Sequence, residues 1–274
     1  PLKWISADSD EPEVRGILYL DSTKTMHALS GLDQKILNKL AVEAANVFEK
    51  LELIQAFEEK KAVEKELALA RETQEMLIPQ KLPEIEGFRI AAFSQPTRHV
   101  GGDFYDFLPA GASSFTGVLA DVSGKGISAA LLSSLVQGAL QMECRAGHPL
   151  SDSLDMVNSY LCQRSQSNRF VTLFVLRLDA EGQGEYLSAG HNPSYLYRSA
   201  DGSIEELDAT NLILGAFEKA RFSSVPIRME PGDVLLVYSD GITDAMNPGD
   251  EMFGEERLKA LVRQTAGAGC KALE

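Results

Sequence analysis

The sequence predicts an α+β fold in which antiparallel strands and helices form layers, and a long helix precedes this domain in the chain. Apolar residues recur at steps of three and four along residues 37–77, which is the period of a helix face. From about residue 85, short apolar runs lie between glycine, proline, aspartate or serine, and DAEGQG between two of them predicts a hairpin turn. Helical stretches fall between groups of strands, which favours α+β layers over an alternating parallel sheet.

The first expected elements are a short buried strand at residues 14–20, VRGILYL, and a helix that runs on to about residue 78, before Pro79 and Pro83. The helix carries two apolar stripes whose phase is interrupted by EEKK at 58–61. Such a pattern is typical of a heptad seam with a phase slip and predicts a dimeric coiled coil. A helix that lies on its own domain is the alternative. The stripes consist of Leu37, Leu40, Ala44, Val47, Leu51 and Ile54, then Val63, Leu67, Ala70, Gln74 and Leu77.

Seven strands and three helices are expected in the remainder of the chain. Each strand is a short apolar run that ends at Gly, Pro, Asp or Ser, and each helix shows apolar residues at helical spacing. The strands are 88–96, 113–122, 169–178, 184–189, 194–198, 222–229 and 233–240, and the helices are 126–145, 150–165 and 254–266.

The composition excludes several classes of protein. Forty acidic residues against 26 basic ones give a formal charge of -14, so nucleic acid is not an expected partner. No apolar stretch approaches the roughly 20 residues that span a bilayer, and the N-terminus lacks the apolar segment of a signal peptide. The three cysteines lack the spacing of a zinc site, which predicts reduced thiols and a cytoplasmic protein.

Three acidic segments each place an aspartate at the end of an apolar strand beside glycine. They are GGDFYD with Asp103 and Asp106, LADVSGKG with Asp121, and VYSDGITDA with Asp240 and Asp244. Carboxylates at strand ends can converge from distant parts of the chain, and glycine lets backbone carbonyls come close. All-oxygen sites of this kind suit magnesium or manganese.

Other interpretations of the same residues stay open at this point. The aspartates and glycines would also suit plain turns at strand ends. Paired carboxylates also occur in glycosidases, but Trp4 is the only tryptophan in the sequence, so an aromatic platform for sugar is not expected. His191 in SAGHNP is either a general acid or a hydrogen-bonding turn residue, and the turn residue is favoured. Arg98 is either a contact for a substrate phosphate or a solvated arginine.

Four longer motifs occur in one consistent order between about residues 70 and 266. They are ARETQEMLIPQKLPEIEGFRIAAFSQPTRHVGGDFYDF, VLADVSGKGISAALLSS, YLSAGHNPSYLY and LLVYSDGITDAMN. Together they closely resemble the bacterial SpoIIE-type branch of the metal-dependent PPM (protein phosphatase 2C-like) Ser/Thr phosphatases.

The resemblance implies an α/β/β/α sandwich of two antiparallel sheets flanked by helices, with two Mn²⁺ or Mg²⁺ ions at one edge. By that likeness, Asp121 bridges the ions, the backbone carbonyl of Val122 joins one of them, and Asp240 binds the other. Asp103 orients water or completes a ligand shell, and Asp244 touches a third, weaker ion. Asp106 is expected in a supporting or solvent role.

The resemblance also suggests three regions: residues 1–50 as the C-terminal part of a GAF-like sensor domain, 51–84 as a signalling coiled-coil linker, and 85–274 as the phosphatase domain. Both ends look like fragment boundaries. A DD-x-T-type motif that supplies a further metal ligand in the family is missing after Met252, because Glu255 and Glu256 are a poor match. Incomplete metal occupancy is therefore expected for this stretch of chain.

The implied function is dephosphorylation of serine or threonine on a bacterial regulator. In the implied mechanism, a water molecule activated by two metal ions attacks the phosphorus atom. The implied partners are a STAS-type anti-sigma factor antagonist as substrate and a second copy of the chain through the linker. The alternative is a catalytically impaired phosphatase fold that serves as a dimerisation and docking module. A metal-dependent nuclease shares the carboxylate chemistry, but the charge of -14 disfavours it.

Overall fold

The computed structural model describes residues 2–5, 12–16, 31–96, 100–109, 114–145, 148–164 and 169–268. The chain divides into two compact units, Pro1–Glu66 and Leu67–Glu274. Within the described ranges, no helix combines the length and the apolar character that crossing a bilayer requires.

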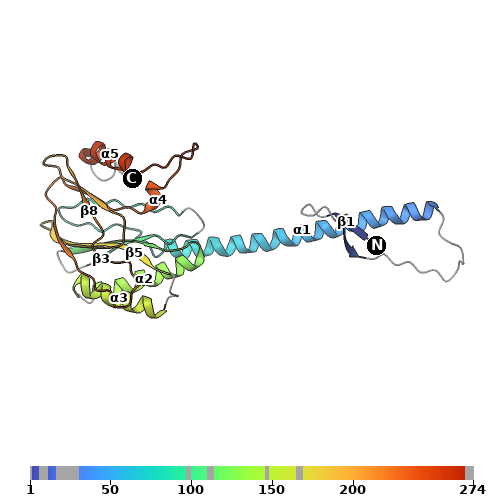
Figure 1. Cartoon of the computed structure of the whole chain (residues 1–274), viewed down its shortest axis with the longest axis horizontal. Helices are drawn as coiled ribbons and strands as arrows, with labels where there is room; N and C mark the ends of the chain where they lie inside the picture. Colours follow the sequence, from blue (N-terminus) through green and yellow to red (C-terminus); the bar gives the residue numbers. More distant parts are fainter. Residues whose placement is uncertain are drawn as a thin grey trace. The chain divides into compact units, whose positions relative to one another are not determined.

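The first unit contains two short strands and most of a long helix (Figure 1). Strand β1 (Leu2–Ile5) pairs antiparallel with β2 (Pro12–Gly16), and helix α1 covers Gly31–Glu75. The predicted long helix is confirmed, and it ends four residues before Pro79. The strand expected at 14–20 overlaps β2, but its residues 17–20 lie outside the described part of the chain.

Helix α1 leaves its first apolar stripe uncovered. Leu40, Val47, Leu51 and Ile54 all retain at least half of their accessible surface. Most helices in proteins gain their stability by packing an apolar face, and this stripe has no such packing among the described residues.

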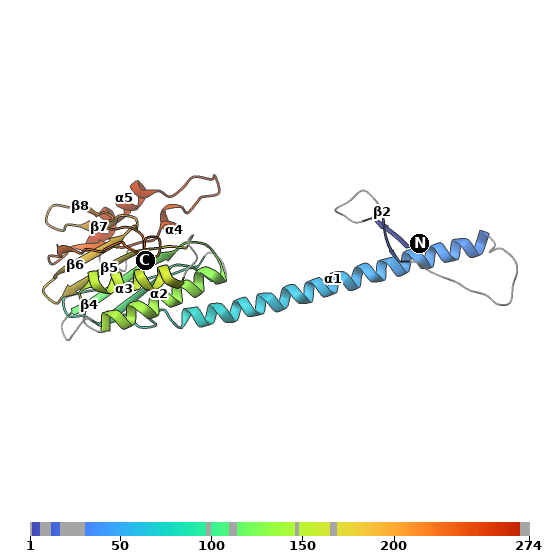
Figure 2. The ribbon, with the colours of Figure 1, turned by 60° about the horizontal axis from the view of Figure 1, so that its bottom comes forward.

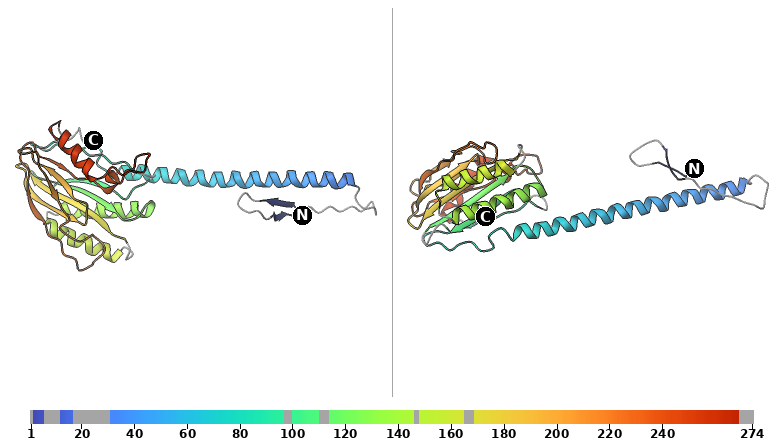
Figure 3. Two further views of the ribbon diagram at one scale, coloured as in Figure 1. Left: turned by 45° about the horizontal axis from the view of Figure 1, so that its top comes forward. Right: turned by 90° about the horizontal axis from the view of Figure 1, so that it is seen from below.

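The second unit has the predicted α+β sandwich, with two sheets between two layers of helices (Figure 2). One antiparallel sheet has five strands in the order β3-β4-β5-β6-β9, and the other has three in the order β10-β7-β8. Helices α2 and α3 cover the outer face of the larger sheet, and α5 covers the smaller one (Figure 3). The strands are β3 (Phe104–Pro109), β4 (Ser114–Val122), β5 (Val171–Asp179), β6 (Gln183–Ala189), β7 (Ser194–Tyr197), β8 (Ile204–Leu207), β9 (Val225–Arg228) and β10 (Val234–Leu236). The helices are α2 (Ile127–Arg145), α3 (Leu150–Arg164), α4 (Asp240–Thr243) and α5 (Glu255–Thr265), followed by a 3₁₀ turn at Ala266–Ala268.

The alternation of side chains along β5 explains why the sheet has a helix layer on one side and a second sheet on the other. Val171, Leu173 and Val175 join the core beneath α2 and α3. Phe174, Leu176 and Leu178 point the opposite way and join the core between the two sheets. Successive side chains of a strand face opposite sides, so a strand buried on both sides must be apolar at every position. FVTLFVL meets that requirement except at Thr172.

The prediction of a strand at residues 88–96 was wrong. Phe88 packs edge-on against Phe115 with ring centroids 5.4 Å apart, and Ile85 and Ile90 pack against the core between the sheets. The described backbone of 89–96 nevertheless has no ladder partner. These side chains are apolar because they seal the edge of the sandwich, and that role does not require backbone pairing.

Three other details differ from the expectation. Strand β8 and the single helical turn α4 were not predicted, because both are too short for periodicity to be visible. The strand expected at 233–240 is shorter and ends at Leu236, and the chain then turns into α4.

Cys144 and Cys162 are free thiols, as expected from their spacing.

Candidate metal centre

Asp121 lies one residue before the end of β4, at the edge of the larger sheet. Its neighbours Ala120 and Val122 are buried beneath the helix layer, so the side chain of Asp121 faces the second sheet. Asp121 stands directly opposite Thr172 in the β4–β5 ladder. The carboxylate is therefore fixed by a fully paired central strand rather than by a loop.

Asp103 reaches the same place from β3. Phe104, the first residue of β3, pairs with Ala120, so the residue before it extends the register to Asp121. The carboxyl groups of Asp103 and Asp121 share a hydrogen bond. Two carboxyl groups in such contact repel each other unless a proton or a cation lies between them.

Asp240 and Asp244 bracket the single turn of α4. The amide of Asp244 donates a 2.8 Å hydrogen bond to the carbonyl oxygen of Asp240, and Asp244 ends the turn. The charges of Asp244 and Asp103 both act on Asp240, and the charge of Asp240 acts on Asp121. The four aspartates that the sequence predicted as a metal centre are therefore electrostatically coupled.

The electrostatics of these groups fit a cation. Burial, the charge of Asp103 with its hydrogen bond, and the charge of Asp240 raise the pKa of Asp121 from 3.8 to about 7. Burial and the charges of Asp244 and Asp103 likewise raise the pKa of Asp240. Carboxylates held together in this way favour a proton or a divalent ion, and oxygen donors suit magnesium or manganese. Among the described residues, however, no group of three or more His, Cys, Asp or Glu side chains is placed so that it could hold a metal ion, and the metal centre stays a prediction from the sequence.

The double glycine before Asp103 has two different roles. A Cβ on Gly102 would lie 2.7 Å from the carbonyl oxygen of Val122, so only glycine lets the two backbones approach at this point. Gly101 instead pairs with a side chain of α1: the Nε2 of Gln74 donates to its carbonyl oxygen at 2.7 Å, and its amide donates to the Oε1 of Gln74 at 3.1 Å. The end of α1 is thereby attached to the segment that carries Asp103.

Asp106 has the supporting role expected for it. It is buried, and its carboxylate accepts hydrogen bonds from Gln137 at 3.1 Å, from Gln141 at 2.9 Å and from the amide of Phe107 at 2.8 Å. The Nε2 of Gln137 also donates to the carbonyl oxygen of Leu77 at 2.7 Å. Asp106 therefore joins β3 to α2 and, through Gln137, to the segment after α1.

His191 is buried and both of its ring nitrogens are engaged. Nε2 lies 3.0 Å from the carbonyl oxygen of Tyr238 and Nδ1 lies 3.0 Å from the hydroxyl of Thr172. Burial lowers the pKa of His191, although the hydrogen bond to Tyr238 and the charge of Asp103 act against it. A carbonyl can only accept, so Nε2 carries the proton and Nδ1 accepts from Thr172. The hydrogen-bonding role favoured from the sequence agrees with this geometry.

Sequence reasoning missed the polar partners of the acidic cluster and placed one residue that the structure does not describe. Gln74 was expected in an apolar stripe, and Thr172 and Lys125 were not singled out. Only Thr172 gave a visible signal, as the one polar residue within the apolar run FVTLFVL. Arg98, the expected phosphate contact, lies outside the described residues.

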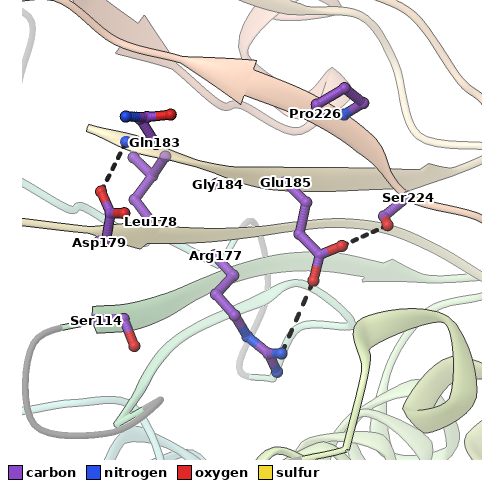
Figure 4. Close-up of a pocket in the computed structure, with 9 residues that line it drawn as sticks. All are labelled: Ser114, Arg177, Leu178, Asp179, Gln183, Gly184, Glu185, Ser224 and Pro226. Atoms are coloured by element: carbon purple, nitrogen blue, oxygen red, sulfur yellow. Dashed lines mark hydrogen bonds and ion pairs between the residues drawn. The ribbon is translucent and has the colours of Figure 1, made fainter. Parts of the chain in front are cut away.

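A separate cavity of about 410 Å³ lies at the opposite end of the larger sheet (Figure 4). Its lining includes Ser114, the first residue of β4, and Asp179, the last residue of β5. Arg177 and Ser224 both contact the carboxylate of Glu185 in its wall. The cavity is not lined by the clustered aspartates, and the Nη2 of Arg177, which is buried, has no hydrogen-bond partner among the described residues.

Comparison with known proteins agrees with this geometry. Residues 113–273 match the family model described as Stage II sporulation protein E (SpoIIE). The chain is 31% identical to Phosphoserine phosphatase RsbU of Bacillus subtilis (strain 168) over 183 residues, which are 66% of this chain and 54% of that protein. It is also similar to the solved RsbU and RsbW domains of Rv1364c from Mycobacterium tuberculosis, with 30% identity and a TM-score of 0.53 over 63% of this chain and 48% of the other.

A more distant solved structure supports the fold alone. The SiaA-PP2C domain of Pseudomonas aeruginosa is 18% identical, with a TM-score of 0.65 over 78% of this chain and 87% of that domain. The chain spans about half or less of the length of the curated relatives it matches.

Proposed function

The chain belongs to the Stage II sporulation protein E (SpoIIE) family, and from that membership we propose that it is a metal-dependent phosphatase for phosphoserine or phosphothreonine in proteins. The observation that carries the proposal is the electrostatic coupling of aspartates from three separate segments: the charges of Asp103 and Asp240 help to raise the pKa of Asp121, and the charge of Asp103 helps to raise the pKa of Asp240. The name of the relative RsbU, a phosphoserine phosphatase, supports the same substrate chemistry.

In this proposal the aspartates and one backbone carbonyl hold two divalent ions. Asp121, Asp103, Asp240 and the backbone carbonyl of Val122 would supply the oxygen ligands, and Asp244 would be a weaker ligand, as the family likeness implies. When bound, Mn²⁺ or Mg²⁺ would lower the pKa of water and offset charge on the phosphoryl oxygens. The chain itself supplies rigidity, because Asp121 lies on a paired strand and His191 connects that strand to the segment leading to Asp240.

The substrate in this proposal is a phosphorylated STAS-type regulator of a sigma-factor pathway, as the family likeness implies. We further propose a homodimer through α1, supported by the uncovered stripe of Leu40, Val47, Leu51 and Ile54. The cytoplasmic location, the GAF-like character of residues 1–50 and the linker at 51–84 remain predictions from the sequence.

The test is hydrolysis of p-nitrophenyl phosphate and of a phosphoserine STAS-type protein by the whole chain, with and without Mn²⁺. The account expects metal-dependent release of phosphate from both, and a loss of at least about 100-fold in Asp121→Asn. Asp152→Asn is the matched control, because Asp152 is an exposed aspartate in the first turn of α3. Equal rates in Asp121→Asn and in the control would remove the enzyme from consideration.

A docking module without catalysis is the second candidate. It is favoured because the described residues contain no group of three or more His, Cys, Asp or Glu side chains that could hold a metal ion. In that case Mn²⁺ would leave the thermal unfolding of the chain unchanged, and the phosphorylated regulator would bind without being turned over. If Mn²⁺ raises the unfolding temperature of the wild-type chain but not that of Asp121→Asn, the result supports the metal-dependent phosphatase over the docking module.

A further inference from the structure

The face of the larger sheet that packs beneath α2 and α3 changes from apolar to polar towards one end. A row of cross-strand partners in the core beneath those helices consists of Val118, Val175 and Leu187. Side chains two positions apart on a strand share a face, so the next row on this face consists of Thr116, Arg177 and Glu185. The cavity of about 410 Å³ lies at this polar end, and both charged members of the row line it (Figure 4).

The guanidinium of Arg177 is held by long hydrogen bonds and is not fully used. Its Nε donates to the hydroxyl of Thr116 at 3.4 Å, and its Nη1 donates to the carbonyl oxygen of His148 at 3.2 Å. Most N–H···O bonds are about 2.9–3.0 Å long. Nη2 is buried and has no hydrogen-bond partner among the described residues. A buried donor without an acceptor is costly, so Arg177 favours any state in which an acceptor reaches Nη2.

Glu185 lies directly opposite Arg177 in the β5–β6 ladder, yet the two side chains stay apart. The Nη1 of Arg177 is 3.8 Å from the Oε1 of Glu185, whereas a charge-assisted N–H···O bond is about 2.7–2.9 Å long. The other carboxylate oxygen, Oε2, accepts a hydrogen bond from the hydroxyl of Ser224 (Figure 4). The wall of the cavity therefore presents a positive and a negative group side by side without a hydrogen bond between them.

The charges of the wall decide which kind of ligand fits. Among the lining residues, Arg177 is positive and Asp179 and Glu185 are negative, so a simple anion such as phosphate would meet a net negative charge. A simple cation would leave the Nη2 of Arg177 without an acceptor. A zwitterion satisfies both groups, because its carboxylate suits the fork of a guanidinium and its ammonium suits a carboxylate. The volume of the cavity is at the lower end of the range for ligand sites, which favours a small molecule.

We propose that this cavity binds a free α-amino acid, whose carboxylate pairs with the guanidinium of Arg177 and whose ammonium pairs with Glu185. Because Nη2 is closed to solvent, the guanidinium turns before both Nη atoms meet the carboxylate. The hydrogen bonds that it gives up are long, so the exchange favours the bound state. Ser224 keeps the carboxylate of Glu185 in place for the ammonium. The site is separate from the clustered aspartates, and this inference goes beyond the proposed function.

The first test varies the ligand and leaves the protein unchanged. Free glycine, leucine and glutamine are titrated into the whole chain and followed by ligand-observed NMR. The tightest of the three is then compared with its N-acetyl derivative, which lacks the ammonium, and with its amide, which lacks the carboxylate. We expect at least one amino acid to bind with a Kd of about 1 mM or tighter, and both derivatives to bind at least about tenfold more weakly. Equal affinity for the derivatives would overturn the inference. So would a Kd weaker than about 10 mM for all three, because a water molecule would then satisfy Nη2.

The second test varies the protein. Arg177→Gln and Glu185→Gln each remove one charge from the wall, and both should weaken binding of the amino acid by at least about tenfold. Glu185→Gln keeps an acceptor for Ser224, so this variant isolates the charge. Arg221→Gln is the matched control, because Arg221 is exposed, pairs with Asp155 and does not line the cavity.

Wild-type affinity in both cavity variants would place the ligand elsewhere and overturn the inference. If Arg177→Gln does not fold, Glu185→Gln and the two ligand derivatives still decide the question. Binding of the amino acid and release of phosphate are separate measurements, so a chain without phosphatase activity would contradict the proposed function and leave this inference in place.

Discussion

The Nε2 of His191 lies 3.0 Å from the carbonyl oxygen of Tyr238, two residues before Asp240. Through its other nitrogen the same ring accepts a hydrogen bond from Thr172, the cross-strand partner of Asp121. One buried imidazole therefore connects the strand of Asp121 to the segment of Asp240. The Nδ2 of Asn192 donates to the same carbonyl at 2.9 Å, so two neighbouring residues hold this connection between the sheets.

Replacing His191 by alanine should destabilise the protein and weaken Mn²⁺ binding. Loss of the ring leaves the half-buried hydroxyl of Thr172 without its acceptor, which costs about 1–2 kcal/mol in the free energy of unfolding. Urea denaturation measures that loss, and calorimetry measures the metal affinity. A general acid would give a different result: unchanged stability, with loss of the alkaline limb of the pH–rate profile.

The histidine also predicts a pH dependence of stability. Burial holds the pKa of His191 below its ordinary value of 6.5, so on acidification the unfolded chain takes up a proton that the folded chain refuses. Stability should therefore fall as the pH drops below about 6.5. The fall should be reduced in His191→Gln. An identical pH dependence in both proteins would contradict the buried, neutral ring.

The metal-free acidic cluster predicts the opposite trend at Asp121. The folded pKa of about 7 lies above the unfolded value of 3.8, so this residue's contribution is present below pH 3.8 and is lost as the pH rises towards 7. Without divalent ions, Asp121→Asn should be more stable than wild type at pH 8, and the difference should shrink at pH 5. Thermal unfolding in a chelator at both pH values measures this. A difference that does not depend on pH would show that Asp121 is not crowded by negative charge.

Gly102→Ala should disturb the site through the backbone. The added Cβ would lie 2.7 Å from the carbonyl oxygen of Val122, so the strand ends must separate at a cost of about 1–3 kcal/mol. Mn²⁺ affinity should fall with stability. Gly138→Ala is the control, because nothing lies within 4 Å of its added Cβ in the middle of α2, and it should stabilise by about 0.5–1 kcal/mol. Wild-type metal affinity in Gly102→Ala would contradict the close approach.

The exposed stripe of α1 predicts self-association. A double substitution Val47→Glu with Ile54→Glu places charge on both stripe positions and should convert a dimer to a monomer in sedimentation. Ala56→Glu adds the same kind of charge outside the stripe and should leave the dimer intact. Dimers that persist in the double variant would place the contact elsewhere on the chain.

The sandwich could be predicted where burial dictates the sequence. Strand β5 is apolar on both faces, and each apolar side chain contributes to one of two cores. Residues 88–96 are apolar for a different reason, which composition alone cannot distinguish, and so a strand was expected wrongly. The aspartates were visible because each follows an apolar strand beside glycine. The role of Gln74 was not visible, because it arises from a contact between segments far apart in the sequence.

Calorimetric titration of Mn²⁺ into the whole chain at pH 7.5 tests the shared aspartate centre most directly. The account predicts that Asp103→Asn, Asp121→Asn and Asp240→Asn each weaken binding by at least about tenfold, with Asp121 the most severe, while Asp152→Asn binds as wild type. Equal Mn²⁺ affinity in all five proteins would contradict it.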